Sequence, residues 1–209
     1  MLDYQENSVT AEDNIEKSAF TKNKYGSVIL SYLHDLTFLI AGVLLVFSLL
    51  FRVVVVSGPS MDTTLTDGDW LLLLGNVLYQ QPEYGDIIVA SKDTYDDGTP
   101  IIKRVIASEG QKVDIDFDAG IVYVDDIPLD EPYTLTPTNT REGVEFPLTV
   151  EEGCLFVMGD NRNVSKDSRS PEIGLIDKRE ILGKAIFLFF PGNKGGEVAR
   201  DFSRIGGVS

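Results

Sequence analysis

The longest apolar segment of the chain is the nearly unbroken run over residues 36–56. At about 1.5 Å per helical residue, these 21 positions span roughly 31 Å, which matches the hydrocarbon core of a bilayer. Arg52 interrupts the run near its end, where a long side chain can place its guanidinium in the interface. The pattern therefore predicts a transmembrane anchor over residues 36–52.

A cleavable secretory signal is the other interpretation of an apolar run near an amino terminus. Such signals have a short basic head and an apolar stretch of roughly 7 to 15 residues. Here 35 mostly polar residues come before the run, and no small-x-small cleavage site follows it. The pattern favours an anchor that is retained.

The basic residues around the anchor predict its orientation. Lys17, Lys22 and Lys24 precede it, whereas Arg52 alone lies close behind it. Lys and Arg are enriched on the cytoplasmic side of membrane spans. The chain is therefore expected to cross the cell membrane once, with residues 1–35 as a cytoplasmic tail. The polar residues 1 to about 24 are expected to be disordered, and the domain after the anchor is expected to be extracytoplasmic.

Residues 53–191 have the hydrophobic pattern of a mainly β domain. Their apolar runs are short, rich in Val, Ile and Phe, and bounded by turn residues. Helical periodicity is scarce, and residues 178–182 are the best short helix candidate. Strands are predicted over residues 52–56, 70–75, 87–91, 101–108, 112–116, 120–124, 155–158 and 183–190.

Local composition predicts the structure of three further segments. Asp125 and Asp126 stand between two apolar runs and predict a hairpin turn. Residues 133–147 are rich in Thr and Pro, which favours an irregular insertion near 117–147. The Gly-rich residues 192–209 are expected to form a flexible tail.

The charge of the chain excludes some classes of partner. The formal net charge is −15, and residues 36–209 carry 27 Asp and Glu against 15 Lys and Arg. This balance argues against nucleic-acid binding and against electrostatic docking on anionic lipid. Contact with a membrane must come from the anchor and from apolar surfaces.

The counts of cysteine and histidine restrict the chemistry of the outer domain. Cys154 is the single cysteine, so an intramolecular disulfide is impossible, and its apolar setting predicts a buried, inert thiol. His34, the single histidine, precedes the anchor. A Ser-His-Asp triad, a Cys-His pair and most zinc sites are therefore excluded there, and no metal or cofactor is expected.

Candidate chemistry gathers in three places: the loop around Ser60, the pair Lys103-Arg104, and the charged segment 159–169. Lys103 lies within an apolar strand pattern, and strand alternation directs it towards the core if Ile102 and Arg104 share the other face. Burial would lower the pKa of its amine, and a neutral amine can accept a proton from a serine hydroxyl. By themselves, these segments are better explained by a surface lysine at a strand edge and by a solvated loop held by Asp-Arg pairs.

Taken together, these segments resemble bacterial type I signal peptidases, the membrane-bound Ser-Lys endopeptidases that release secreted proteins from their signal peptides. Residues 58–65 (GPSMDTTL) resemble the nucleophile box, 84–89 (YGDIIV) the strand box and 102–106 (IKRVI) the lysine box. Residues 159–169 (GDNRNVSKDSR) are similar to the family's most diagnostic signature, which Gly174 and residues 181–185 continue. The resemblance covers residues 52–190, is closest to Gram-positive members, and implies an antiparallel β-sheet catalytic domain of the signal-peptidase type.

The resemblance implies a role for each matching residue. Ser60 becomes the nucleophile and Lys103 the general base, while Ser165 hydrogen-bonds the lysine amine and orients it. The backbone N–H of Ser60 receives the oxyanion, and Gly58 occupies the position where some members carry a helpful serine.

Two ion pairs are implied as supports for the strands that carry the dyad. Asp160 is expected to pair with Arg104, and Asp167 with Arg169. Thr63 departs from the family, which usually has proline at that position, and this affects loop stiffness rather than the reacting groups.

The implied substrates are signal peptides of secreted preproteins with small residues at positions −1 and −3. They bind as an added strand, and Met61, Ile87 and Val89 are the candidate pocket residues. The other implied partners are the lipid bilayer and, as a candidate, the secretion translocon. Two other hypotheses stay open: a Ser-Lys self-cleaving protease of related fold, and a membrane-tethered β-domain without catalytic activity.

Overall fold

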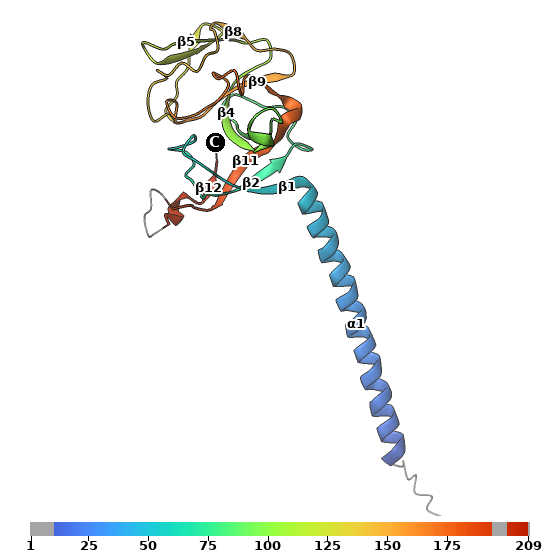
Figure 1. The fold of residues 1–209 in the computed structure, drawn as a ribbon. Helices are drawn as coiled ribbons and strands as arrows, with labels where there is room; N and C mark the ends of the chain where they lie inside the picture. The colour runs from blue at the N-terminus through green and yellow to red at the C-terminus, as the bar shows by residue number, and fades with distance from the viewer. Residues whose placement is uncertain (1–10, 194–199, 209) are drawn as a thin grey trace, which may run out of the picture. The chain divides into compact units, whose positions relative to one another are not determined.

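The computed structural model describes residues 11–193 and 200–208, with side chains from Val28 onward. The chain divides into two units, residues 1–48 and 49–209. Figure 1 shows the long helix α1 and the β-strands of the second unit.

Helix α1 runs over Ala11–Leu50, and no proline interrupts its 40 residues. Its part Val28–Leu50 has a mean hydropathy of 2.1 and is long and apolar enough to cross a membrane. The helix ends two residues before the predicted boundary, because Phe51 and Arg52 belong to strand β1, where Arg52 pairs with Leu73. The last residues of the apolar run therefore form hydrogen bonds to β2 instead of continuing the helix.

The prediction of disorder up to residue 24 is wrong for residues 11–24, which are helical. Their polarity led to that prediction, but Ala, Glu and Lys are strong helix formers, and extending an existing helix needs no new nucleation. Residues 1–10 lie outside the described part of the chain.

The second unit is built from antiparallel strands, as the sequence predicted. In the described residues, the main sheet has the order β1-β2-β11-β3-β4-β9-β10, with β12 paired to β11 (Figure 1). A smaller sheet has the order β7-β6-β5-β8. The main-sheet strands are β1 Phe51–Val55, β2 Trp70–Gly75, β3 Ile87–Ala90, β4 Ile101–Ser108, β9 Cys154–Met158, β10 Ile176–Asp177, β11 Ile181–Phe190 and β12 Gly206–Gly207. The smaller sheet contains β5 Lys112–Asp116, β6 Ile121–Val124, β7 Ile127–Pro128 and β8 Leu148–Thr149.

The position of β4 in the main sheet explains the burial of its centre. It pairs with β3 on one side and with β9 on the other, and all five residues 103–107 are buried. A central strand covered on both faces leaves no solvated side for a polar residue. Lys103 is therefore buried together with its apolar neighbours.

Two apolar clusters of this unit lie next to the candidate chemistry. One joins Met61 and Leu65 of the loop after β1 to Leu71, Leu73 and Leu188 of β2 and β11. The other packs Phe156 and Met158 of β9 against the smaller sheet. Cys154 packs at the margin of this second cluster and is half-buried rather than fully buried.

The predicted helix over residues 178–182 is wrong. Lys178–Glu180 form one turn of 3₁₀ helix, capped by Asp177, and β11 begins at Ile181. A segment of five residues is too short to sustain an isolated helix. The backbone bonds between β11 and β3 decide its conformation instead.

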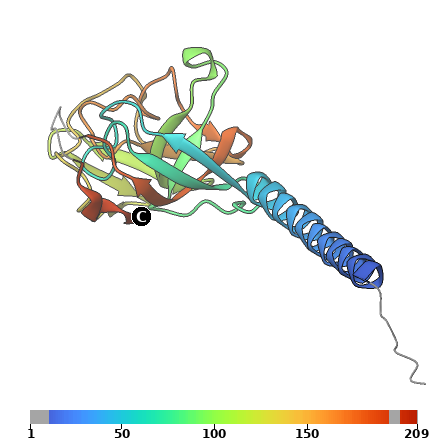
Figure 2. The same ribbon diagram turned by 90° about the horizontal axis from the view of Figure 1, so that it is seen from below.

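The prediction of a flexible tail over residues 192–209 is wrong for the described residues in that range. Gly192 is buried, Phe202–Arg204 form a 3₁₀ turn, and Gly206 and Gly207 pair with Leu188 and Phe187 of β11. Figure 2 shows this segment lying against the β-strands. Residues 194–199 and 209 lie outside the described chain. The glycine content indicated flexibility. The unpaired backbone groups along this part of β11, however, can bind another strand, and Gly206 and Gly207 form hydrogen bonds to them.

The hairpin turn at Asp125 and Asp126 is confirmed. Both residues have positive φ, 53° and 65°, as a type I′ turn requires, and Val124 pairs with Ile127 beyond them. The insertion near 117–147 is only partly irregular, because β6 and β7 lie within it. Residues 133–147 contain no strand among those described.

Replacement of Phe156 by Ala is expected to destabilise the domain by about 3–5 kcal/mol. Phe156 is fully buried on β9 and meets the ring of Phe146 edge-on at 5.8 Å, so truncation leaves a cavity in the core. Denaturant unfolding of the full chain in detergent measures the loss. Ile127→Ala, at a position 65% exposed on β7, is the control and should change stability by less than about 0.5 kcal/mol. Equal effects would contradict the assigned core.

Candidate active site

Ser60 lies in the loop that joins β1 to β2. The loop is closed at its base, where the Val56 N–H donates to the Asp69 carbonyl at 2.8 Å and the Gly68 N–H donates to the Val56 carbonyl at 2.9 Å. At its tip, Asn161 donates its backbone N–H to the Ser60 carbonyl at 3.0 Å and its side-chain amide to the Pro59 carbonyl at 3.1 Å. The serine is thus fixed from two directions.

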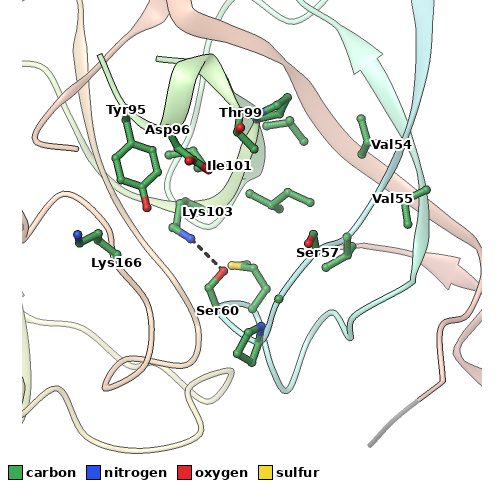
Figure 3. Close-up of a pocket in the computed structure, with 17 residues that line it drawn as sticks. Val54, Val55, Ser57, Ser60, Tyr95, Asp96, Thr99, Ile101, Lys103 and Lys166 are labelled. Atoms are coloured by element: carbon green, nitrogen blue, oxygen red, sulfur yellow. Dashed lines mark hydrogen bonds between the residues drawn. The ribbon is translucent and has the colours of Figure 1, made fainter. Parts of the chain in front are cut away.

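Lys103 reaches Ser60 from β4. Its Nζ donates to the Ser60 Oγ at 2.9 Å, and Figure 3 shows the amine pointing at the hydroxyl. The side chain is 5% exposed, and burial lowers the pKa of the amine to about 8. At this separation a neutral amine can accept the hydroxyl proton. The two residues singled out in the sequence for a nucleophile and a base are therefore in hydrogen-bonding contact.

Arg104, the next residue of β4, forms the ion pair expected from the sequence. Its Nε and one terminal nitrogen donate to the two oxygens of Asp160 at 2.9 and 2.8 Å, and both side chains are buried. The other terminal nitrogen donates to the Gly85 carbonyl at 2.7 Å, and Thr64 donates its hydroxyl to Asp160 at 2.5 Å. This pair joins β4, the loop after β9 and the loop that carries Ser60.

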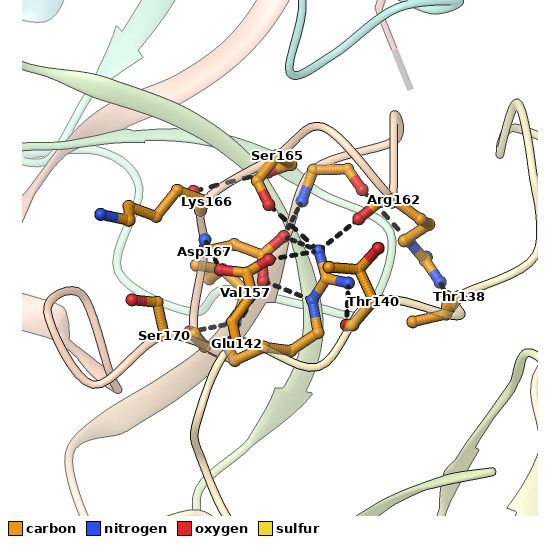
Figure 4. A network of polar contacts seen from close by, with 12 residues as sticks. Thr138, Thr140, Glu142, Val157, Arg162, Ser165, Lys166, Asp167 and Ser170 are labelled. Carbon is orange, nitrogen blue, oxygen red and sulfur yellow. Dashed lines mark hydrogen bonds and ion pairs between the residues drawn. The ribbon is translucent and has the colours of Figure 1, made fainter. Parts of the chain in front are cut away.

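The second expected ion pair, between Asp167 and Arg169, lies at the centre of a larger network (Figure 4). Arg169 donates to both oxygens of Asp167 at 2.8 Å and to the carbonyls of Arg162 and Ser165 at 2.6 and 3.2 Å. It also forms an ion pair with Glu142 at 3.1 Å. The network holds the segment after β9 in one conformation beside Lys103.

Ser165 is buried in this segment, but the hydrogen bond between its hydroxyl and the lysine amine that the resemblance implied is not formed among the described residues. Its hydroxyl donates to the Lys166 carbonyl at 3.5 Å, and in the described residues Ser60 is the hydrogen-bond partner of the Lys103 amine. A Cβ on Gly159 would come within 2.2 Å of the Ser165 Oγ and 2.5 Å of the Ser60 carbonyl oxygen. The loops of Ser60 and Ser165 therefore meet across a position that only glycine can occupy.

The backbone N–H of Gly58 is already hydrogen-bonded within the loop. It donates to the Asp67 carboxylate at 2.8 Å, and Gly58 has a φ of +86°, which favours glycine. Its N–H therefore serves the loop structure, and the backbone N–H of Ser60 stays the candidate oxyanion donor.

A cavity of about 300 Å³ opens beside the serine. Residues 54–61, from the end of β1 into the Ser60 loop, and residues 99–103, at the start of β4, line it together with Tyr95, Asp96 and Lys166 (Figure 3). Of the three candidate pocket residues, Met61 and Val89 line the cavity, whereas Ile87 does not and is buried in the core. The described residues contain no group of His, Cys, Asp or Glu that could hold a metal.

Several residues around the site were missed by the sequence analysis. Asn161 lies within the recognised signature, so its position there was the available signal. Glu142, Tyr95 and Asp96 come from irregular segments without hydrophobic periodicity. Their approach to the site depends on how those segments fold back.

The replacement Glu142→Gln is expected to lower the pKa of the Lys103 amine below about 8. Burial is the main cause of the depressed pKa, and it is opposed by the carboxylates of Asp167, Glu142 and Asp160, while Arg169 adds to the depression. Removing one anion therefore disfavours the ammonium form. An NMR titration of lysine labelled at Cε in the full chain measures the change, with the Lys103 signal assigned from Lys103→Arg.

Glu145→Gln is the matched control, because Glu145 is an exposed carboxylate of the same irregular segment. It should leave the titration of Lys103 unchanged. An unchanged or raised Lys103 pKa in Glu142→Gln would contradict the electrostatic account.

Comparison with known proteins identifies relatives over most of the chain. The family model described as "Signal peptidase, peptidase S26" matches residues 29–190. A probable signal peptidase I-1 of Synechocystis sp. is 40% identical over 169 residues, which are 75% of this chain and 82% of that protein. Signal peptidase I of Bacillus licheniformis is 37% identical over 159 residues, which are 72% of this chain and 83% of the relative. A crystal structure of a signal peptidase I from Enterococcus faecalis matches at 28% identity with a TM-score of 0.42, over 50% of this chain and 97% of its own.

Proposed function

Since the chain belongs to the signal peptidase family, peptidase S26, and is a serine endopeptidase that cleaves signal peptides from preproteins, we propose that Ser60 is its nucleophile and Lys103 its general base. The contact of 2.9 Å between the Lys103 Nζ and the Ser60 Oγ carries this proposal. The depressed pKa of the amine supports it, because a base must be neutral at the working pH.

The first half of the reaction forms an acyl-enzyme. Neutral Lys103 takes the proton from the Ser60 hydroxyl as the Oγ attacks the scissile carbonyl carbon. The developing oxyanion accepts a hydrogen bond from the backbone N–H of Ser60. The lysine ammonium then gives its proton to the leaving amine, and the bond between the signal peptide and the mature protein breaks.

The second half releases the signal peptide. Lys103, neutral again after protonating the amine, takes a proton from water, and the resulting hydroxide attacks the ester carbonyl. The ammonium returns the proton to the Ser60 Oγ as the ester bond breaks. One base serves both halves because it lies on a rigid central strand.

The substrate is an extended segment with small side chains at positions −1 and −3. The cavity is lined by the end of β1 at Val54 and Val55 and by the start of β4 at residues 101–103, so a peptide can lie along these strands in extended form. Met61 and Val89 are the pocket residues that we retain, because both line the cavity, whereas Ile87 does not.

The enzyme is anchored in the cell membrane by Val28–Leu50, with its amino terminus cytoplasmic and its β-domain outside. Lys17, Lys22 and Lys24 on the amino-terminal side support this orientation.

External protease added to intact cells should digest the β-domain and spare an amino-terminal tag. Protection of the whole β-domain would overturn the orientation.

Ser60→Ala and Lys103→Ala are each expected to lower kcat/KM for preprotein cleavage by at least about 1,000-fold. The first variant lacks the attacking oxygen and the second lacks the base. Cleavage by the full chain in detergent, followed on a gel, measures the loss, and thermal unfolding shows that the variants fold. Normal cleavage by either folded variant would rule out the dyad.

The pH dependence of kcat/KM is expected to follow the titration of Lys103. Because the neutral amine is the active form, the rate should fall about tenfold for each pH unit below a midpoint near 8 and reach a plateau above it. Lys112, an exposed lysine on β5, offers the control Lys112→Gln, which should keep the midpoint. A rate that falls as pH rises through 8 would contradict a lysine base.

A further inference from the structure

The carboxyl-terminal segment contacts the loop that carries Ser60. Arg204 donates to both oxygens of Asp69, at 2.9 and 2.6 Å, and to the Thr64 carbonyl at 3.3 Å. Asp69 and Thr64 both belong to the loop between β1 and β2. The contact thus joins a residue near the end of the chain to the segment four residues beyond the serine.

Asp69 is the residue that closes this loop, and its carboxylate is fully buried. Besides Arg204, it accepts hydrogen bonds from the backbone N–H groups of Thr66 and Gly192, each at 2.7 Å. A buried carboxylate requires a compensating charge, and in the described chain Arg204 is its ion-pair partner. The loop therefore depends on a cation that a distant segment supplies.

The segment that carries Arg204 is itself fixed to the main sheet. Gly206 and Gly207 pair with β11, and the Val208 N–H donates to the Ile186 carbonyl at 3.2 Å. The side chain of Val208 packs on the apolar cluster that contains Met61 and Leu65 of the Ser60 loop. Arg204 therefore links the Ser60 loop to β11 and fixes the position of the loop relative to that strand.

Two buried carboxylates hold the residues just after Ser60 from different sides. Asp160, paired with Arg104, accepts the hydroxyl of Thr64, and Arg204, paired with Asp69, donates to the carbonyl of the same Thr64. The first pair belongs to the motifs recognised in the sequence. The second depends on Arg204, which lies beyond residues 29–190 of the family match.

We propose that residues 201–208 form a clasp in which Arg204 is a positioning residue that holds the Ser60 hydroxyl in reach of the Lys103 amine. This inference rests on the proposed function of that dyad. Arg204 touches neither substrate nor the reacting atoms and acts through Asp69 and Thr64. Since a displacement of 1 Å at a reacting group can slow a reaction about 100-fold, the clasp should affect the rate of chemistry more than substrate binding.

The test compares Arg204→Ala with Arg200→Ala in the full chain in detergent. Arg200 is exposed, lies 4.2 Å from the Phe190 ring and bonds Asn193, so it is a matched arginine without contact to the Ser60 loop. We expect Arg204→Ala to lower kcat by about 10- to 100-fold with KM changed less than about threefold. Arg200→Ala should behave as wild type, and Arg204→Lys should recover part of the loss, because it restores the charge without the bidentate geometry.

Two further measurements separate positioning from loss of folded protein. An inhibitor that traps Ser60 as an acyl-enzyme counts the active sites, so that kcat is expressed per competent molecule. The midpoint of the pH profile should stay near 8, because the burial of Lys103 on β4 does not involve the clasp. If Arg204→Ala unfolds at the assay temperature, Arg204→Gln gives the same comparison, since glutamine keeps a donor towards Asp69 and loses the charge.

Wild-type kcat per active site in a folded Arg204→Ala or Arg204→Gln would overturn the clasp, as would an equal loss in Arg200→Ala. This outcome is distinct from failure of the dyad. If Ser60→Ala and Lys103→Ala cleave normally, the proposed function fails whatever Arg204 does. If both are inactive while the Arg204 variants are normal, the clasp alone is wrong.

Discussion

The burial of one amine is the physical constraint on which the rest of this structure depends. Lys103 is buried in a central strand, and the loss of hydration disfavours its charged form. Three carboxylates nearby oppose this effect, yet Asp160 is bound by Arg104, and Asp167 and Glu142 are bound by Arg169. Because arginine offsets their charge, desolvation prevails and the pKa of the lysine falls to about 8.

This arrangement allows many charged residues to surround a lysine that, as the proposed base, must be neutral. A carboxylate bonded directly to the amine would hold it as an ammonium ion, which cannot accept a proton. Arginine cannot lose its own proton at these pH values, so it keeps each carboxylate occupied permanently. Buried ion pairs of this kind add little net stability, but they fix the geometry of the segments that they join. Here they join the Ser60 loop, β4 and the loop after β9.

The sequence analysis was most successful where a local pattern and a recognised motif agreed. The main strands, the turn at Asp125 and Asp126, and the pairs of Arg104 with Asp160 and of Asp167 with Arg169 are all present. It was least successful where a long-range contact decides the structure. Residues 192–209 have the composition of a disordered tail, and an open edge of β11 together with the buried charge of Asp69 orders the described part of them. The resemblance implied a hydrogen bond between Ser165 and the lysine amine, whereas in the described structure the Ser165 hydroxyl donates to the Lys166 carbonyl and lies beside Gly159.

The sequence by itself predicted the apolar helix and the β class from hydrophobic periodicity, and its motifs singled out Ser60 and Lys103 as the candidate dyad. Strand alternation directed Lys103 towards the core only on the condition that Ile102 and Arg104 share the other face. Tertiary structure decided its burial, the lining of the cavity, and the contact of Arg204 with Asp69 across 135 positions. Burial and long-range charge pairing arise from packing between distant segments, and no local pattern along a chain encodes them.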